Sequence, residues 1–348
     1  MDTRKRIDIM RNITVRIEDL DIFPGLERQA DFFIDILRRR YDVTILTDKV
    51  QKPDILFFTC YGGNNLKWNN SVRIYYTAER DFPNYNLCDY AIGLSDIGIP
   101  NRFLHFPIYV FYNDLLRKYE SIDPTDVDPN WALGREFCST VVSDPFRDRI
   151  YFDLFKKLNE YKTIASGGRL DNTTGFRVPD KLEFIKNYKF NLAFENMKAP
   201  GYVTEKLLEP FVARTVPIYW GSSDWAKKEF GEGGYIDISD FDTLDQAVEY
   251  IKKVDNDNEL YMQILRRGAQ MSHTYEEWCN ILLDYLTHII EHGERIYDCR
   301  RNYSYNEKFI YYRIRDNKLV QLFRKTIRAI NYFRLYGRHD VGEIYKTH

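Results

Sequence analysis

The chain has 348 residues, and its 50 Lys and Arg against 52 Asp and Glu give a formal net charge of −2. Hydrophobic residues make up 44% and charged residues 29%, a globular balance that excludes a disordered or collagen-like chain. The near-neutral charge argues against a partner nucleic acid, and the length suggests about two domains.

The first third of the chain alternates short apolar runs with a helical pattern. Apolar residues recur at helical spacing over Leu26–Arg40, which predicts a helix there. The apolar runs predict four strands, at Ile13–Ile17, Val43–Leu46, Ile55–Thr59 and Val72–Tyr76. This β/α rhythm is typical of an open, mostly parallel sheet.

A second β/α series follows a stretch rich in Pro and Asp. The periodic pattern weakens between Pro107 and Leu133, so we predict a first domain over residues 1–125 and a second over 126–300. Two such α/β units usually bind ligand in the cleft between them, at the carboxyl ends of strands. The predicted strands are Phe137–Val142, Tyr161–Ala165, Phe190–Phe194 and Val216–Trp220, and the predicted helices are Arg147–Asn159, Glu205–Ala213, Leu244–Val254 and Glu276–His292.

The last part of the chain, residues 301–348, is a basic tail. Nine basic residues and one acidic residue lie in Lys308–Arg338. Apolar residues recur at roughly helical spacing over Lys318–Arg338, with basic residues between them, which predicts an amphipathic helix. Two interpretations remain open: the helix packs on the rest of the chain, or it lies on an anionic membrane surface.

Several familiar signatures are missing or weak. The sequence contains neither GxGxxG nor the P-loop pattern. Its five cysteines are scattered without a CxxC pair, so we expect reduced thiols in a cytoplasmic protein. The first residues, MDTRKRIDIMRNITV, carry charges with no apolar run behind them, so we expect no signal peptide. We expect no metal site: His288 and His292 fit an ordinary helix, and Asp240 and Asp242 are interpreted as caps of the next helix.

The most informative stretch is Tyr188–Gly221, which reads as a strand, a polar loop, a capped helix and another strand. Thr204 suits the N-cap of that helix and Glu205 suits its first turn, so a well-made helix start would explain both. The loop and the first turn of the helix hold more polar residues than a helix start requires. Because a helix N-terminus beside a lysine, here Lys206, is a natural diphosphate site, a phosphate ligand is indicated. Glu205 could bind sugar hydroxyls.

Five segments carry a family resemblance. Phe194–Asn196, Gly201–Lys206 and Val216–Gly221 closely resemble, in order and spacing, the donor-binding signature of the bacterial-type α-1,3-fucosyltransferases of glycosyltransferase family 10. Gly167–Thr173 looks like the glycine-arginine loop of that family. Tyr75–Asn86 looks like its N-terminal loop with the catalytic glutamate. The basic tail matches no signature.

The resemblance implies a GT-B fold: two Rossmann-like domains facing across a cleft, the first for the acceptor and the second for GDP-fucose. It implies an inverting transfer of L-fucose from GDP-β-L-fucose to a hydroxyl. The expected hydroxyl is O3 of GlcNAc in an N-acetyllactosamine-type glycan, which gives a Lewis-x-like product. The step needs one base and positive charge for the departing diphosphate. No tightly bound cofactor is implied, although divalent ions could stimulate turnover by binding released GDP.

The resemblance also assigns residues. It implies that Glu79, directly after the strand Val72–Tyr76, is the base; a surface ion pair with Arg80 is the alternative. The planar fork of Arg169 and the point charge of Lys206 suit diphosphate oxygens. Donor contacts are expected from Glu205, Tyr202 and Asn196, and weaker nucleotide-site candidates are Ser143, Asp144 and Arg149.

Two other functions remain open at this point. One is a transferase of the same fold that uses a different nucleotide sugar. The other is a non-catalytic module that binds glycans or membranes. For the fucosyltransferase, we expect a cytoplasmic enzyme held peripherally on the inner face of the membrane through residues 308–338, beside lipid-linked acceptors of surface polysaccharide.

Overall fold

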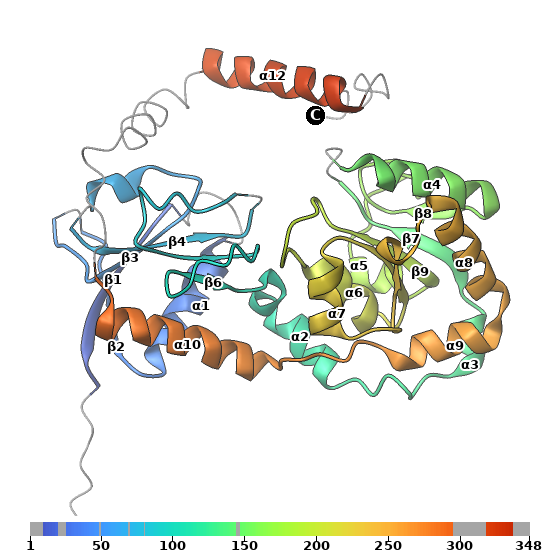
Figure 1. Ribbon diagram of the computed structural model, residues 1–348, viewed down its shortest axis with the longest axis horizontal. Coiled ribbons are helices and arrows are strands. Elements are labelled where there is room, and N and C mark those ends of the chain that lie inside the picture. Colours follow the sequence, from blue (N-terminus) through green and yellow to red (C-terminus); the bar gives the residue numbers. More distant parts are fainter. Residues whose placement is uncertain are drawn as a thin grey trace, which may run out of the picture. The chain divides into compact units, whose positions relative to one another are not determined.

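The computed structural model describes residues 10–19, 26–48, 50–68, 70–79, 81–143, 147–294 and 318–336. The chain forms two compact units, each built on one parallel sheet (Figure 1). The first unit runs to Phe106 and resumes at Glu276, and the second contains Pro107–Tyr275. This division differs from the predicted boundary at residue 125, which also assigned the helix after Glu276 to the second domain.

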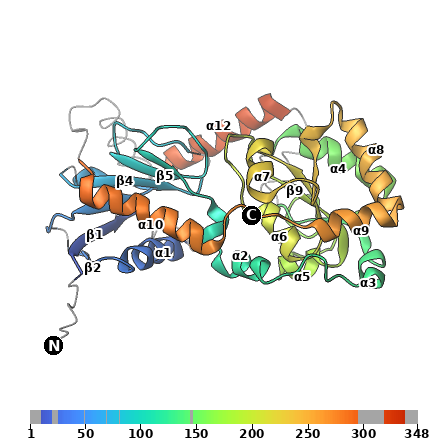
Figure 2. The same ribbon diagram turned by 60° about the horizontal axis from the view of Figure 1, so that its bottom comes forward.

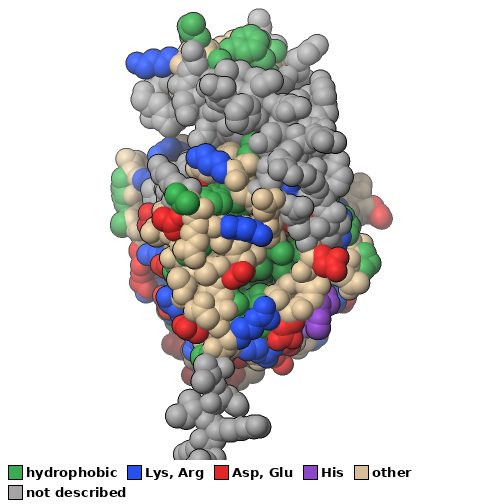
Figure 3. Space-filling view, turned by 90° about the vertical axis from the view of Figure 1, so that its left-hand side faces the viewer, with side chains coloured by type: hydrophobic (Ala, Val, Ile, Leu, Met, Phe, Trp, Pro, Cys, Tyr) green, Lys and Arg blue, Asp and Glu red, His purple; other side chains and the backbone are tan. Residues whose placement is uncertain are grey.

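The first unit contains a six-stranded sheet in the order β2-β1-β3-β4-β5-β6, with every neighbouring pair parallel. The four predicted strands are confirmed, and the weaker apolar runs of β5 and β6 were not predicted. On the face of this unit seen in Figure 3, basic and acidic side chains are intermingled. The strands are β1 Asn12–Glu18, β2 Asp42–Ile45, β3 Ile55–Phe58, β4 Val72–Thr77, β5 Tyr90–Gly93 and β6 Phe103–His105.

Helices α1 (Leu26–Arg38) and α10 (Tyr275–His292) lie side by side in the first unit (Figures 1 and 2). Phe33 of α1 stacks on Phe57 of β3, with ring centroids 5.0 Å apart. In α10, Trp278 packs edge-on against Phe106, and the Tyr285 hydroxyl donates to the carbonyl of Ala91 in β5. These buried contacts explain why α10 belongs to the first unit, far along the chain from its strands.

The second unit contains a five-stranded parallel sheet in the order β11-β10-β9-β7-β8. The predicted strand at Tyr161–Ala165 begins later than expected, because Tyr161 still belongs to the preceding helix. The short β11 was not predicted. The strands are β7 Glu136–Thr140, β8 Ile164–Ser166, β9 Tyr188–Phe194, β10 Val216–Trp220 and β11 Ile236–Asp237.

Helices pack against this sheet, and α4 and α8 lie side by side (Figures 1 and 2). The side chain of Thr243 caps α8 in a capping box with Gln246, so the prediction that Asp240 and Asp242 cap this helix was wrong. The helices are α2 Asn113–Glu120, α3 Pro129–Leu133, α4 Arg149–Tyr161, α5 Lys181–Ile185, α6 Glu205–Val212, α7 Ser223–Phe230, α8 Leu244–Asn256 and α9 Asn258–Arg267; short 3₁₀ turns lie at Asn64–Lys67, Ile108–Phe111 and Ile238–Asp240.

The order of strands in the second sheet creates a switch point between β7 and β9. The chain moves outward from β7 to β8 and then crosses to the other side of β7 to form β9. Because all five strands are parallel, the segments that follow β7, β8, β9 and β10 emerge at one edge of the sheet. Ligands of open α/β sheets bind at such an edge, next to the switch point.

The basic tail contains helix α12 (Lys318–Tyr336), which confirms the helix predicted in that region. Residues 301–317 and 337–348 of the tail lie outside the described residues. No helix in the described ranges is both long enough and apolar enough to cross a bilayer. Five large apolar side chains of α12 are exposed: Leu319, Leu322, Phe323, Ile327 and Ile330.

Candidate active site

The predicted donor residues lie at the switch-point edge of the second unit. Ser143 follows β7, Arg169 follows β8, and the segment from Glu195 to Lys206 joins β9 to α6. Gly221 directly follows β10. These four segments are distant in sequence, yet they begin at one edge of the sheet because the strands before them are parallel. Asp144 lies outside the described residues.

Two glycines let these segments approach one another closely. A Cβ on Gly168 would lie 1.9 Å from the carbonyl oxygen of Val142, so the segment after β8 packs directly on the backbone after β7. A Cβ on Gly221 would lie 2.7 Å from Cγ of Glu195. Only glycine fits at either position, which fixes the spacing of the segments around the site.

The first turn of α6 is capped as the sequence predicts. The Thr204 hydroxyl accepts a hydrogen bond from the backbone N–H of Lys206 over 3.4 Å. Gly201 enters the turn with a φ of 75°, and its N–H donates to the Ser222 hydroxyl over 3.1 Å. The positive end of the α6 dipole and its backbone N–H groups therefore lie in the same segment as the predicted donor residues.

A buried carboxylate lies beneath this turn. Oε1 of Glu195 accepts the Thr204 N–H and Oε2 accepts the Thr204 hydroxyl, both over 2.7 Å. The ammonium of Lys206 lies 3.6 Å from the same Oε2, and the Glu195 side chain is fully buried. Burial raises the pKa of Glu195, and the positive charge of Lys206 opposes this shift.

Several acidic and basic side chains lie close together around Lys206. Its ammonium lies 3.9 Å from Glu205 Oε1, and Lys181 of α5 pairs with Glu209. Burial alone would raise the pKa of Glu205, but Lys206 and Lys181 hold it below its usual value. Glu205 is therefore ionised at neutral pH, and both lysines have carboxylate partners before any ligand binds. A diphosphate would compete with these carboxylates.

The other predicted donor residues occupy varied environments. Arg169 is exposed on the segment after β8, and Asn196 is half-buried. Tyr202 is only 3% exposed, so its side chain packs within the unit. Ser143 is exposed, and Arg149 pairs with Asp153 across one turn of α4 while its own side chain is 80% exposed. The structure brings these residues to one edge of the sheet, and their individual roles stay predictions.

Two residues of this edge were not assigned a role from the sequence. Glu195 belongs to the resembling segment Phe194–Asn196, yet its contacts with Thr204 and Lys206 follow only from the turn geometry. Arg147 is buried and donates to the carbonyl of Phe194, the last residue of β9, over 2.8 Å. It thereby ties the β7 segment to β9 across the switch point. The sequence predicted Arg147 as the first residue of a helix, whereas α4 begins at Arg149 and leaves Arg147 in the segment before it.

In the first unit, Glu79 is exposed two residues after β4. Its backbone N–H donates to the Thr77 hydroxyl over 3.0 Å, and its Oε1 accepts the hydroxyl of Tyr61 over 2.6 Å. Burial and the neighbouring carboxylate raise the pKa of Tyr61, so this phenol stays a donor at neutral pH. The alternative partner considered for Glu79, Arg80, lies outside the described residues.

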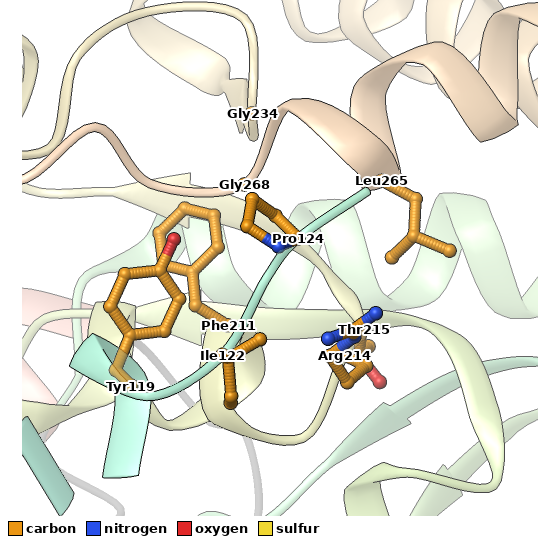
Figure 4. A pocket seen from close by; sticks show the side chains of 9 residues that line it. All are labelled: Tyr119, Ile122, Pro124, Phe211, Arg214, Thr215, Gly234, Leu265 and Gly268. Carbon is orange, nitrogen blue, oxygen red and sulfur yellow. The ribbon is translucent and has the colours of Figure 1, made fainter. Parts of the chain in front are cut away.

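A small pocket in the second unit is not part of this constellation. Figure 4 shows its largely apolar wall. Its polar groups are used internally: the Tyr119 hydroxyl donates to the carbonyl of Ala269 over 2.7 Å, and the Arg214 guanidinium donates to that of Asp123 over 2.8 Å. The lining residues are Tyr119, Ile122, Pro124, Phe211, Arg214, Thr215, Gly234, Leu265 and Gly268, and none of them is a predicted site residue.

The described residues contain no cluster of three or more His, Cys, Asp or Glu side chains arranged to hold a metal ion. His288 and His292 are exposed on α10 with ring centroids 5.5 Å apart. Two neighbouring imidazoles on one helix face supply at most half of a tetrahedral metal site. The expectation of a metal-free site stays a prediction.

Both halves of the chain match family models. Residues 135–288 match the model for the C-terminal part of glycosyltransferase family 10 (fucosyltransferase), and residues 17–112 match that for the N-terminal domain of the α-(1,3)-fucosyltransferase FucT. The α-(1,3)-fucosyltransferase FucT of Helicobacter pylori is 33% identical over 263 residues, which cover 66% of this chain and 54% of that protein. The chain thus spans about half the length of this relative.

Crystal structures of α1,3-fucosyltransferases also resemble this chain. A crystal structure of an α1,3-fucosyltransferase with GDP is 26% identical, with a TM-score of 0.70 over 86% of this chain and 95% of that one. A crystal structure of such an enzyme with GDP-fucose is 25% identical, with a TM-score of 0.69 over 85% and 96% of the two chains. These likenesses confirm the family resemblance and the GT-B fold class predicted from the sequence.

Proposed function

Because the chain belongs to glycosyltransferase family 10, we propose that it is an α-1,3-fucosyltransferase with GDP-β-L-fucose as donor. The observation that carries the proposal is the placement of Lys206 in the first turn of α6, at the edge where four strand ends converge. A helix N-terminus beside a lysine suits a diphosphate. The similar α1,3-fucosyltransferases solved with GDP and with GDP-fucose support the choice of donor.

On the donor side, Lys206, Arg169 and the N–H groups of α6 neutralise the charge that builds on GDP as it leaves. Glu205 is ionised and 22% exposed, so it can accept hydrogen bonds from sugar hydroxyls. We assign further donor contacts to Asn196 and Tyr202 and weaker ones to Ser143 and Arg149. Divalent ions would stimulate turnover by binding released GDP.

On the acceptor side, Glu79 is the general base. The acceptor oxygen attacks C1 of fucose, the bond from C1 to the phosphate oxygen breaks, and its electron pair leaves with GDP. The acceptor hydroxyl proton passes to the Glu79 carboxylate. A single displacement inverts GDP-β-L-fucose into an α-linked fucoside, and no covalent sugar–protein bond forms.

We propose O3 of GlcNAc in an N-acetyllactosamine-type glycan as the acceptor. We also propose a location on the inner face of the cytoplasmic membrane, where lipid-linked acceptors would be available. The exposed apolar side chains of α12 and its neighbouring basic residues, Arg324 and Lys325, support this location, since both suit an interfacial helix.

A panel assay tests the function. The protein is incubated with GDP-fucose and each of several glycans, GDP release is followed, and the linkage of the product is determined by NMR. Acceptor-dependent release of GDP with a new α-1,3-fucoside is expected. Thermal protection by UDP-sugars but not by GDP-fucose would favour the other nucleotide-sugar transferase, and a protein that binds glycans without releasing GDP would be a non-catalytic module.

A further inference from the structure

Glu195 is a carboxylate buried without access to water at the end of β9. Its backbone N–H donates to the carbonyl of Trp220 over 2.9 Å, which anchors the residue between β9 and β10. A buried charge is costly unless it is paired and hydrogen-bonded. The partners of Glu195 are Thr204 and Lys206, so the carboxylate connects the rigid sheet to the first turn of α6.

The Thr204 hydroxyl connects Glu195 to Lys206 by hydrogen bonds, and this link is the relay. Because its proton is directed at Oε2 of Glu195, its oxygen lone pairs remain to accept hydrogen bonds from Lys206. Both the backbone N–H and the ammonium of Lys206 lie within reach of that oxygen, at 3.4 and 3.3 Å. Glu195 therefore acts on Lys206 twice, through the direct ion pair and through the orientation of the Thr204 hydroxyl.

We infer that Glu195 is a positioning residue, which fixes the ammonium of Lys206 at the α6 N-terminus before the donor binds. The inference rests on the proposed function, in which Lys206 stabilises the departing diphosphate. The Lys206 side chain is 18% exposed, so its ammonium can reach a ligand while it stays paired with the buried carboxylate. Positioning of this kind contributes to catalysis because a misplaced group stabilises the transition state less.

The test is a double-mutant cycle between Glu195→Gln and Lys206→Ala, read as kcat and KM for GDP-fucose. The glutamine keeps the oxygen for the Thr204 N–H, but its amide must donate to the Thr204 hydroxyl oxygen and carries no charge. Lys206 then loses both the ion pair and the relay. We expect Glu195→Gln to lower kcat by about 10²-fold in the native background. In the Lys206→Ala background the same change should cost less than about threefold.

A matched control lies at the opposite end of the same strand. Asp255 is a buried carboxylate that pairs with Lys189 of β9 over 3.1 Å, near the amino end of the strand. Asp255→Asn also removes a buried carboxylate charge, which pairs with Lys189 and with Lys162, yet it should leave kcat within about twofold while it lowers the melting temperature. A purely structural role for Glu195 would make the two variants alike.

The outcomes separate the inference from the proposed function. If Lys206→Ala keeps native kcat and KM, the proposed diphosphate site is wrong. If Lys206→Ala is impaired but Glu195→Gln costs the same in both backgrounds, the positioning inference alone is overturned. Should Glu195→Gln fail to fold, Thr204→Val removes the relay, and Thr204→Ser keeps it. Loss of kcat in the valine variant with recovery in the serine variant supports the inference, and equal kcat in both overturns it.

Discussion

The Tyr61 hydroxyl donates a 2.6 Å hydrogen bond to Oε1 of Glu79. The two residues follow β3 and β4, which are neighbouring parallel strands, so their side chains meet at the carboxyl edge of the first sheet. The bond engages one carboxylate oxygen and orients the group, while Glu79 itself remains exposed. The proposed base is thus held by a residue that the sequence did not single out.

Replacement of Glu79 by glutamine should abolish most transfer. The amide keeps the shape and can still accept the bond from Tyr61, but it cannot take the acceptor proton. A general base contributes about 10²–10⁴-fold, and we expect kcat to fall within that range while GDP affinity stays native. Single-turnover kinetics and calorimetry with GDP measure the two quantities. Near-native kcat would exclude Glu79 as the base.

Tyr61→Phe should lower kcat about tenfold without changing GDP affinity. A hydrogen bond to a charged group contributes about 1.5 kcal/mol, which corresponds to roughly a factor of ten in rate. Tyr75→Phe is the matched control, because its hydroxyl donates to Asp81 rather than to Glu79, also over 2.6 Å. Equal losses of kcat in the two variants would contradict a specific role for Tyr61.

Arg169→Ala and Lys206→Ala should each weaken GDP binding and also lower kcat, because both charges act on the departing diphosphate. Lys206→Arg should restore only part of the activity, since the planar fork differs in geometry from the ammonium beside Glu195 and Glu205. Lys157→Ala is the control variant, because Lys157 pairs with Asp245 on the α4–α8 side of the second unit. Native GDP affinity and kinetics in both site variants would refute the phosphate assignment.

The sequence predicted the strands and the helix start that carry the candidate donor residues, while the roles of those residues stay predictions. Strands β7, β9 and β10 have strong apolar runs, so the segments after them could be placed at one edge, and the cap at Thr204 followed from local chemistry. The contacts of Tyr61 with Glu79 and of Arg147 with Phe194 depend on how separate segments meet. The same holds for the packing of α10 in the first unit. Local patterns do not contain such long-range information.

Asp255 should stabilise the second unit in a pH-dependent manner. Burial alone would raise the pKa of Asp255, but Lys162 and Lys189 hold it below its ordinary value of 3.8. The folded state therefore binds fewer protons than the unfolded state, so this stabilisation is present above pH 3.8 and is lost as the pH falls through the folded pKa. Asp255→Asn should lower the free energy of unfolding by about 3 kcal/mol at pH 7, because it removes the carboxylate partner of both Lys162 and Lys189. Denaturant unfolding at several pH values measures this, and a difference that does not shrink in acid would contradict it.

Removal of residues 308–348 should release the protein from anionic vesicles and leave activity on soluble acceptors largely intact. Each basic residue near such a surface contributes about 1 kcal/mol, and the apolar side chains of α12 add burial. Co-sedimentation at low and high salt checks the prediction. If the full chain fails to bind the vesicles, or if the truncated chain unfolds, the tail instead packs on the rest of the protein.

The return of α10 to the first unit has a consequence for synthesis on the ribosome. Trp278 and Tyr285 complete the packing around Phe106 and Ala91 only after the whole of Pro107–Tyr275 has been made. The part of the second unit that carries its sheet lies within the continuous stretch Pro107–Tyr275 and can fold as it emerges, whereas the first unit waits with an uncovered apolar face. The sheet of the amino-terminal unit is therefore covered later than the sheet of the second unit, so its nascent form needs protection from aggregation for longer.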